Sequence, residues 1–292
     1  MLFLLLAGAL AAGGDAASSP STRCVTLAVY TKKLAVVSDL KAEELAISEG
    51  GRERRILAVE PDERRLDVAI VIDSSASVTS SYRSELVPGV IEFLKAMRPG
   101  TAVAVWTTAP AKVADFGSDP AVVEPKLRTI AAAGGNYAVD SMTDACKELG
   151  PRGAPRRAIV YVGGASLLAN AQNLAELMRA VGVARAVPMT VLLLAGGNGA
   201  GAGGMSGNAV HSFDVQGYLG GMAKGYFGFY VESLSPLAVA QWLRQAAADL
   251  NGQYRVVFES EPGPEGVLKV SLKRKDAKLR VGRTETQIPG SN

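Results

Sequence analysis

The chain has 292 residues, more than the roughly 100–200 of a typical single domain, so a full domain with a smaller module is expected. Hydrophobic residues make up 48% and charged residues 20%, which excludes a mainly disordered chain, because disorder requires few apolar residues and a high net charge. The 31 basic and 28 acidic residues leave a net charge of +3, too small over this length to indicate nucleic-acid binding.

An apolar run near the N-terminus, Leu2 to Ala12, is shorter than the about 20 residues that a membrane-spanning helix needs. Small residues after it, Ala16 and Ala17, offer cleavage points, although no Lys or Arg precedes the run. We interpret residues 1–17 as a signal peptide, the alternative being an unprocessed apolar tail. The interpretation predicts an exported protein, periplasmic or extracellular, with no transmembrane segment after signal removal.

Short β-like runs at both ends of the chain predict one small β module. Each group of about three strands is too small for a stable isolated sheet, so we expect the two groups to pack together as a sandwich beside the central domain. A turn is predicted at 49–52. The predicted strands are 25–30, 45–48 and 56–59 near the N-terminus, and 254–258, 267–272 and 279–281 near the C-terminus.

Between the two ends, apolar runs alternate with helical patterns. Residues 66–72 are apolar except for Asp67, as in a strand buried on both faces of a parallel sheet. The alternation predicts an α/β fold with a doubly wound, mostly parallel, Rossmann-like sheet. Pro88 should delay or kink the first helix, and Ser235 is expected to cap the last. Further strands are predicted at 102–106, 158–162, 189–194 and 227–231, and helices at 82–97, 170–181 and 236–250.

Polar side chains follow the first of these strands, in the D-x-S-x-S sequence that begins at Asp73. Sites in such sheets lie beyond the carboxyl ends of the strands. Oxygens of Asp73, Ser75 and Ser77 could together meet a hard divalent cation, which prefers oxygen ligands. The alternative is that the serines cap the following helix.

The tract 66–77 resembles the von Willebrand factor type A (VWA) domain, in which this motif forms the first part of a metal-ion-dependent adhesion site. The stretches 37–51 and 250–273 are similar to those of the VWFA-related family first described in acidobacteria, so the resemblance covers nearly the whole mature chain. Together with the patterns above, it predicts an N-terminal β segment at 18–64, a VWA-like domain at 65–250 and a C-terminal β segment at 251–292.

The chain departs from the family pattern in two loops. The family's second metal loop offers a Thr after a Gly-Gly pair, whereas here Asn136 follows that pair and Asp140 keeps its usual place. The third loop offers an Asp, whereas here the strand runs into Gly163 and Gly164 with no carboxylate. The missing Asp removes negative charge that would offset the cost of dehydrating Mg²⁺.

The resemblance therefore implies a partly degenerate adhesion site made by Asp73, Ser75, Ser77 and Asn136, with Mg²⁺ or another divalent cation as the cofactor it would hold. Asp140 and Asp144 could supply additional charge to it. The alternative for these two is acidic charge in the opening turns of a helix, where the helix dipole favours anions.

Other motifs give weaker signals. Residues 199–204 match G-x-G-x-x-G, but no helix is expected to begin there, so the Gly-rich tract to Gly228 is predicted to be a surface loop. The only histidine, His211, is expected in this loop near Asp214, and no G-x-S-x-G motif accompanies it. A basic cluster without interleaved aromatics is expected to be the solvated tip of a hairpin. It consists of Lys273, Arg274, Lys275, Lys278 and Arg280.

The two cysteines, Cys24 and Cys146, are too few for a disulfide framework or a four-ligand zinc set, and could be buried thiols or a disulfide pair. We predict an exported VWA-domain protein that binds a protein or matrix partner through the carboxyl edge of its sheet. Neither an enzyme nor a nucleic-acid-binding protein is indicated, and the oligomeric state is open. The alternative function is a metal-independent structural scaffold of the cell envelope.

Overall fold

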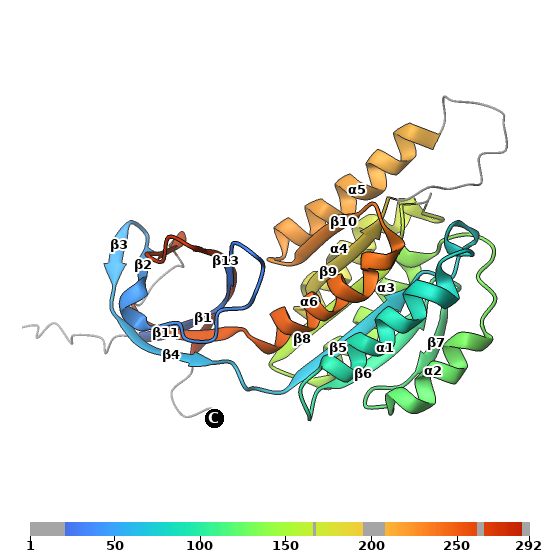
Figure 1. Cartoon of the computed structure of the whole chain (residues 1–292). Helices are drawn as coiled ribbons and strands as arrows, with labels where there is room; N and C mark the ends of the chain where they lie inside the picture. Colours follow the sequence, from blue (N-terminus) through green and yellow to red (C-terminus); the bar gives the residue numbers. More distant parts are fainter. Residues whose placement is uncertain (1–20, 166–167, 195–207, 262–265, 288–292) are drawn as a thin grey trace, which may run out of the picture.

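The chain forms an α/β body with a smaller β module at one end (Figure 1). The computed structural model describes residues 21–165, 168–194, 208–261 and 266–287, without the side chains of 208–216 and 286–287. The proposed signal peptide at 1–17 and the glycine motif at 199–204 lie outside the described residues. Within them, no helix combines the length and apolarity needed to cross a membrane.

A six-stranded sheet forms the centre of the α/β body, in the order β10-β9-β8-β5-β6-β7. Neighbouring strands are parallel except for β7, which is antiparallel to β6 at one edge. This is the doubly wound, mostly parallel sheet predicted from the sequence, although the short strand β7 is an addition. The strands are β5 (Leu66–Ile72), β6 (Ala102–Thr107), β7 (Ala111–Ala114), β8 (Arg156–Gly164), β9 (Val187–Leu193) and β10 (Phe229–Ser233).

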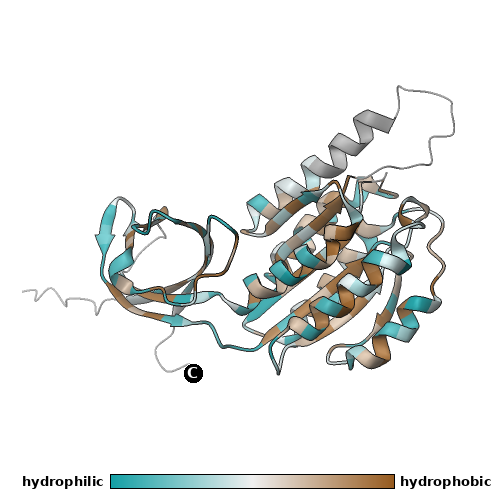
Figure 2. Cartoon of the chain, in the orientation of Figure 1, coloured by the Kyte–Doolittle hydropathy of each residue, from teal (hydrophilic) through white to brown (hydrophobic). Residues whose placement is uncertain are grey.

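The burial of β5 on both faces of the sheet explains why its sequence is almost continuously apolar. Val68 and Ile70 pack into a core on one face of the sheet, and Ala69 and Val71 into a core on the other. The polar exception, Asp67, is buried and forms a 2.7 Å ion pair with Arg152. In Figure 2 the central strands are accordingly the most hydrophobic part of the body.

In the part of the chain that the structure describes, six α-helices cover the two faces of the sheet. Residues of α1, α2 and α6 line the first core, and residues of α3, α4 and α5 line the second. A π-helical segment, Tyr82–Leu86, precedes α1, so the regular helix begins only at Val87 with Pro88 in its first turn, as expected. The helices are α1 (Val87–Ala96), α2 (Pro120–Thr129), α3 (Ala138–Leu149), α4 (Leu174–Ala184), α5 (Asn208–Gly225) and α6 (Val239–Asn251).

The β module consists of two antiparallel sheets around one apolar core, in the orders β13-β1-β11-β4 and β12-β2-β3. Strand β1 pairs with both β11 and β13, so the two ends of the chain form one module, which confirms the prediction. The short strand β3 was not predicted. The strands are β1 (Ser21–Thr31), β2 (Leu45–Glu49), β3 (Arg52–Arg54), β4 (Ile56–Pro61), β11 (Tyr254–Ser260), β12 (Leu268–Leu272) and β13 (Ala277–Gln287).

The surface loop predicted up to Gly228 is wrong for residues 208–225, which form α5. His211 and Asp214 therefore lie in a helix. Glycines disfavour helices, but Leu219 and Met222 of α5 pack into the second core, and tertiary packing outweighs local propensity.

Three smaller expectations have clear outcomes. Ser235 precedes a short 3₁₀ turn and its side chain makes no capping hydrogen bond. In the basic cluster, which was expected to be a solvated hairpin tip, Arg274 forms ion pairs with Asp39 and Glu44. Cys24 and Cys146 are both buried free thiols, and burial raises the pKa of Cys146 to about 12.

Candidate functional site at the carboxyl edge of the sheet

Asp73 follows β5 at the carboxyl edge of the sheet and is fully buried. Both of its carboxylate oxygens accept hydrogen bonds from the chain itself. Oδ1 accepts from Ser75 N at 2.8 Å and Thr108 Oγ1 at 3.2 Å. Oδ2 accepts from Gly164 N at 2.9 Å and Asn136 Nδ2 at 3.2 Å, and Ser77 Oγ lies 3.5 Å from it. The carboxylate of Asp73 is therefore surrounded by five neutral hydrogen-bond donors from four segments of the chain.

The serine hydroxyls of the loop converge as the motif predicted. The Oγ atoms of Ser75 and Ser77 are 2.8 Å apart. Ser75 stands before a 3₁₀ turn, Ala76–Val78, but its side chain makes no capping bond. The hydroxyl of Ser74 instead accepts a hydrogen bond from Ala109 N at 3.2 Å. These side chains thus join neighbouring loops rather than cap the following helix.

Asn136 is oriented by the start of α3. Its Oδ1 accepts a hydrogen bond from Ala138 N at 3.0 Å, so its amide nitrogen faces the opposite way. That nitrogen donates to Asp73 and, at 2.9 Å, to the hydroxyl of Tyr161. Burial and then the charge of Asp73 raise the pKa of Tyr161 well above its ordinary value, which keeps this phenol protonated.

Two glycines, Gly163 and Gly164, end β8 beside Asp73. A Cβ on Gly163 would lie 2.3 Å from Cβ of Asp73 and 2.4 Å from the Tyr161 hydroxyl, so only glycine fits. The close approach lets the N–H of Gly164 reach Asp73. A backbone donor thus faces Asp73 from the end of β8.

Backbone hydrogen bonds tie these loops together. Ala76 N donates to Gly134 O at 3.0 Å, and Ala133 N donates to Ser74 O at 2.9 Å. Tyr137 N donates to the carbonyl of Thr108 at 3.1 Å. The loops after β5, β6 and β8 and the loop before α3 therefore form one connected rim, which we call the Asp73 rim.

Asp140 and Asp144 are not among the residues bonded to Asp73. Both lie in α3, Asp140 in its first turn, as the alternative interpretation expects. The carboxylate of Asp140 accepts hydrogen bonds from Asn170 at 2.6 Å and Asn173 at 3.0 Å, which orders the segment before α4.

The donors around Asp73 do not fit a resident divalent cation. Such an ion needs several oxygen ligands, with their negative ends directed toward it. Here an amide N–H₂ and a backbone N–H are directed at Asp73 Oδ2, and Oδ1 is taken by two further donors. Among the residues that the structure describes, no group of three or more His, Cys, Asp or Glu side chains is gathered to hold a metal.

Sequence reasoning missed Thr108 and Tyr161, which both contribute to this network. Thr108 could have been predicted more easily than Tyr161, because it directly follows β6 and sites in such sheets lie beyond the carboxyl ends of neighbouring strands. Tyr161 lies inside β8, where nothing in the sequence separates it from an ordinary core residue.

Comparison with known proteins finds no matching family model and no matching curated protein. Solved structures do match. The von Willebrand factor type A structure from Catenulispora acidiphila is 13% identical, covering 92% of this chain and 74% of its own, with a TM-score of 0.46. The vWF domain of the type V pili tip protein Mfa5 from Porphyromonas gingivalis is 22% identical, covering 36% and 39%, with a TM-score of 0.31. The manganese-loaded TRAP protein of Plasmodium vivax is 12% identical, covering 78% and 97%, with a TM-score of 0.42.

The similar structures include von Willebrand type A domains, as the sequence resemblance predicted. The chain spans 39% and 28% of the length of the two Mfa5 structures that it matches. The assignment of the fold rests on the chain's own strand order and on the place of the Asp73 loop after β5.

Proposed function

We propose that the chain is an exported binding module that engages a protein or matrix partner through the Asp73 rim, without a divalent cation. The observation that carries the proposal is the saturation of Asp73 by donors from its own chain. These bonds hold the surrounding loops in one arrangement before any partner arrives, and a preorganised surface loses less entropy on binding.

The surface beside the rim supports a protein partner. Leu234 and Leu237 directly follow β10 at the same edge of the sheet and are 81% and 78% exposed. Tyr137, next to Asn136, is also partly exposed. Exposed apolar side chains beside polar loops are typical of protein interaction sites.

The first test concerns the metal. Calorimetric titration of the purified protein with Mg²⁺, Mn²⁺ and Ca²⁺ is expected to give no binding tighter than about 1 mM, because the acceptors of Asp73 are already occupied. Asp73→Ala serves as the control and should give the same titration. Micromolar binding that Asp73→Ala abolishes would contradict the proposal and favour metal-dependent adhesion.

The second test concerns the partner. Immobilised protein should capture the same partner from an envelope extract in Mg²⁺ and in EDTA. The double variant Leu234→Asp/Leu237→Asp should lose capture at least about tenfold, because charge opposes burial of this surface. Leu57→Asp, on β4 of the β module and 42% exposed, is the matched control and should behave as wild type. Unchanged capture by the double variant would favour the scaffold alternative.

A further inference from the structure

A cavity of about 50 Å³ lies where the β module meets the amino edge of the central sheet. It is lined by the starts of β8 and β9, the end of α6, and residues of β1 and β13. A single water needs about 10–15 Å³ measured in this way, so the cavity has room for a small polyatomic ion. It lies at the opposite edge of the sheet from the Asp73 rim and is independent of the function proposed there.

The lining is strongly basic. Among the described residues, six arginines and a single carboxylate, Glu285, line the cavity. Asp62, just outside the lining, binds Arg64 through bonds of 2.9 and 2.8 Å, and Asp249 pairs with Arg280. Three carboxylates thus face six guanidinium groups. The arginines are Arg64, Arg156, Arg157, Arg185, Arg280 and Arg283.

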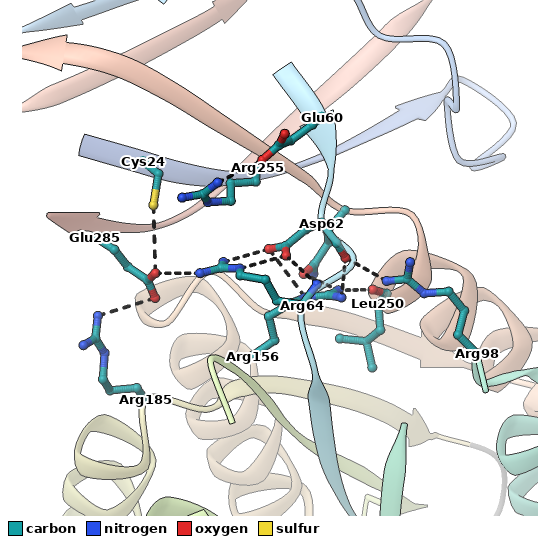
Figure 3. A network of polar contacts seen from close by, with 11 residues as sticks. Cys24, Glu60, Asp62, Arg64, Arg98, Arg156, Arg185, Leu250, Arg255 and Glu285 are labelled. Carbon is teal, nitrogen blue, oxygen red and sulfur yellow. Dashed lines mark hydrogen bonds and ion pairs between the residues drawn. The ribbon is translucent and has the colours of Figure 1, made fainter. Parts of the chain in front are cut away.

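Part of this cluster joins the two bodies (Figure 3). Arg156 donates to the carbonyl of Asp62 at 2.7 Å and to the carbonyl of Leu250, and burial lowers its pKa to about 10. Glu285 is shared between Arg64 at 3.1 Å and Arg185 at 3.7 Å. Asp62 and Glu285 thus already pair with arginines of the cluster, and other arginines of the lining have no carboxylate within ion-pair distance in the described part of the chain.

Among the described residues, Arg157 and Arg283 are the cavity arginines with no carboxylate within ion-pair distance, although Glu285 attracts both from farther away. Arg157 donates to the carbonyl of Gly150 at 3.0 Å, and its Nε is buried without a partner in the described part of the chain. The side chain of Arg283, which also lines the cavity, makes no hydrogen bond or ion pair with any described residue. Burial, followed by the charge of nearby Arg185, lowers the pKa of both groups. An anion placed between them would relieve this repulsion.

A β-bulge turns Arg283 toward the cavity. Val25 pairs with Thr284 and Leu27 with Val281, so Gly282 and Arg283 both stand opposite Thr26. Before the bulge, Leu279 and Val281 pack on the core of the β module, whereas Arg280 lines the cavity. If the strand alternated regularly through Gly282 and Arg283, Arg283 and Glu285 would face that core. The bulge places both on the cavity side instead.

Guanidinium groups bind phosphate oxygens through paired, charge-assisted hydrogen bonds, and several of them around one cavity are typical of oxyanion recognition. We propose that this cavity binds one small oxyanion of the phosphate class, either free phosphate or the phosphoryl group of a small phosphomonoester, through Arg157, Arg185 and Arg283.

The test is calorimetric titration of the purified protein at pH 7 with inorganic phosphate and, separately, with glycerol 3-phosphate. One anion should bind per chain, and phosphate should raise the midpoint of thermal unfolding above that in chloride of equal ionic strength. Arg283→Gln and Arg185→Gln should each weaken binding at least about tenfold. Arg185 is half-exposed, so its variant should fold even if Arg283→Gln does not.

Arg244→Gln is the matched control, because Arg244 is an exposed arginine of α6 that faces Glu92 and does not line the cavity. It should bind phosphate as wild type does. Tighter binding of glycerol 3-phosphate would identify a phosphomonoester, and tighter binding of phosphate would identify the free ion. Absence of binding at 10 mM phosphate, about the weakest affinity that an arginine site should show, or wild-type binding by Arg185→Gln, would overturn the proposal.

Discussion

Gly163 is the residue that allows the close packing around Asp73. Because a Cβ at this position would lie 2.3 Å from Cβ of Asp73, Gly163→Ala must push β8 away from the loop after β5. We expect the variant to lose about 1–3 kcal/mol of unfolding free energy, as in other overpacked cores, measured by urea denaturation.

Gly221→Ala is the matched control for this substitution. Gly221 lies in α5 with nothing within 4 Å of its Cβ position, and alanine favours helix. The control should therefore be neutral or stabilising. Equal stability of Gly163→Ala and wild type would show that the loops around Asp73 are not closely packed.

The sequence was sufficient to predict that Asp73, Ser75 and Ser77 share one loop at the site, but not the other oxygens that join them or the state of their hydrogen bonds. The D-x-S-x-S motif after a buried strand indicates the loop that carries Asp73, Ser75 and Ser77, because strand direction fixes where that loop lies. Asn136 was expected to lend an oxygen. An amide carries both a donor and an acceptor, and the N–H of Ala138, known only from the structure, decides which of the two faces Asp73.

At the scale of elements, the predictions from long apolar runs were correct, whereas those for short or glycine-rich segments were not. Strand β5 buries both faces, so its composition leaves little ambiguity. Strand β7 has four residues at a sheet edge, and α5 carries its apolar contacts at Leu219 and Met222 among four glycines of residues 217–225. In both cases, the stabilising contacts come from distant parts of the chain, and a local pattern cannot contain them.

At the scale of the molecule, Asp62 connects the β module to the α/β body and should make stability depend on pH. Asp62 is 1% exposed. Burial alone would raise its pKa, but hydrogen bonds from Arg64 and the charge of Arg156 hold the pKa below its ordinary value. The stabilising contribution is therefore fully present above the unfolded pKa of about 3.9 and is lost as pH falls through the lower folded value.

We expect the free energy of unfolding to fall between about pH 5 and pH 2, and Asp62→Asn to flatten this dependence. Urea denaturation across this range measures both. Asp39→Asn is the control, because the side chain of Asp39 is 73% exposed in its ion pair with Arg274 and should matter much less. The same acid dependence in wild type and Asp62→Asn would show that Asp62 is not the group responsible.

The bulge opposite Thr26 has a consequence for how the C-terminal strand tolerates insertions and deletions. Loss of the single codon for Gly282 would leave Arg283 alone opposite Thr26 and keep the remainder of β13 on its present faces, whereas one residue inserted after Arg283 would exchange inside for outside. After such an insertion the carboxylate of Glu285 would enter the apolar interior while Thr284 turned outward. The parity of the residue count in this strand, more than the identity of any one side chain, decides which side of the module carries charge.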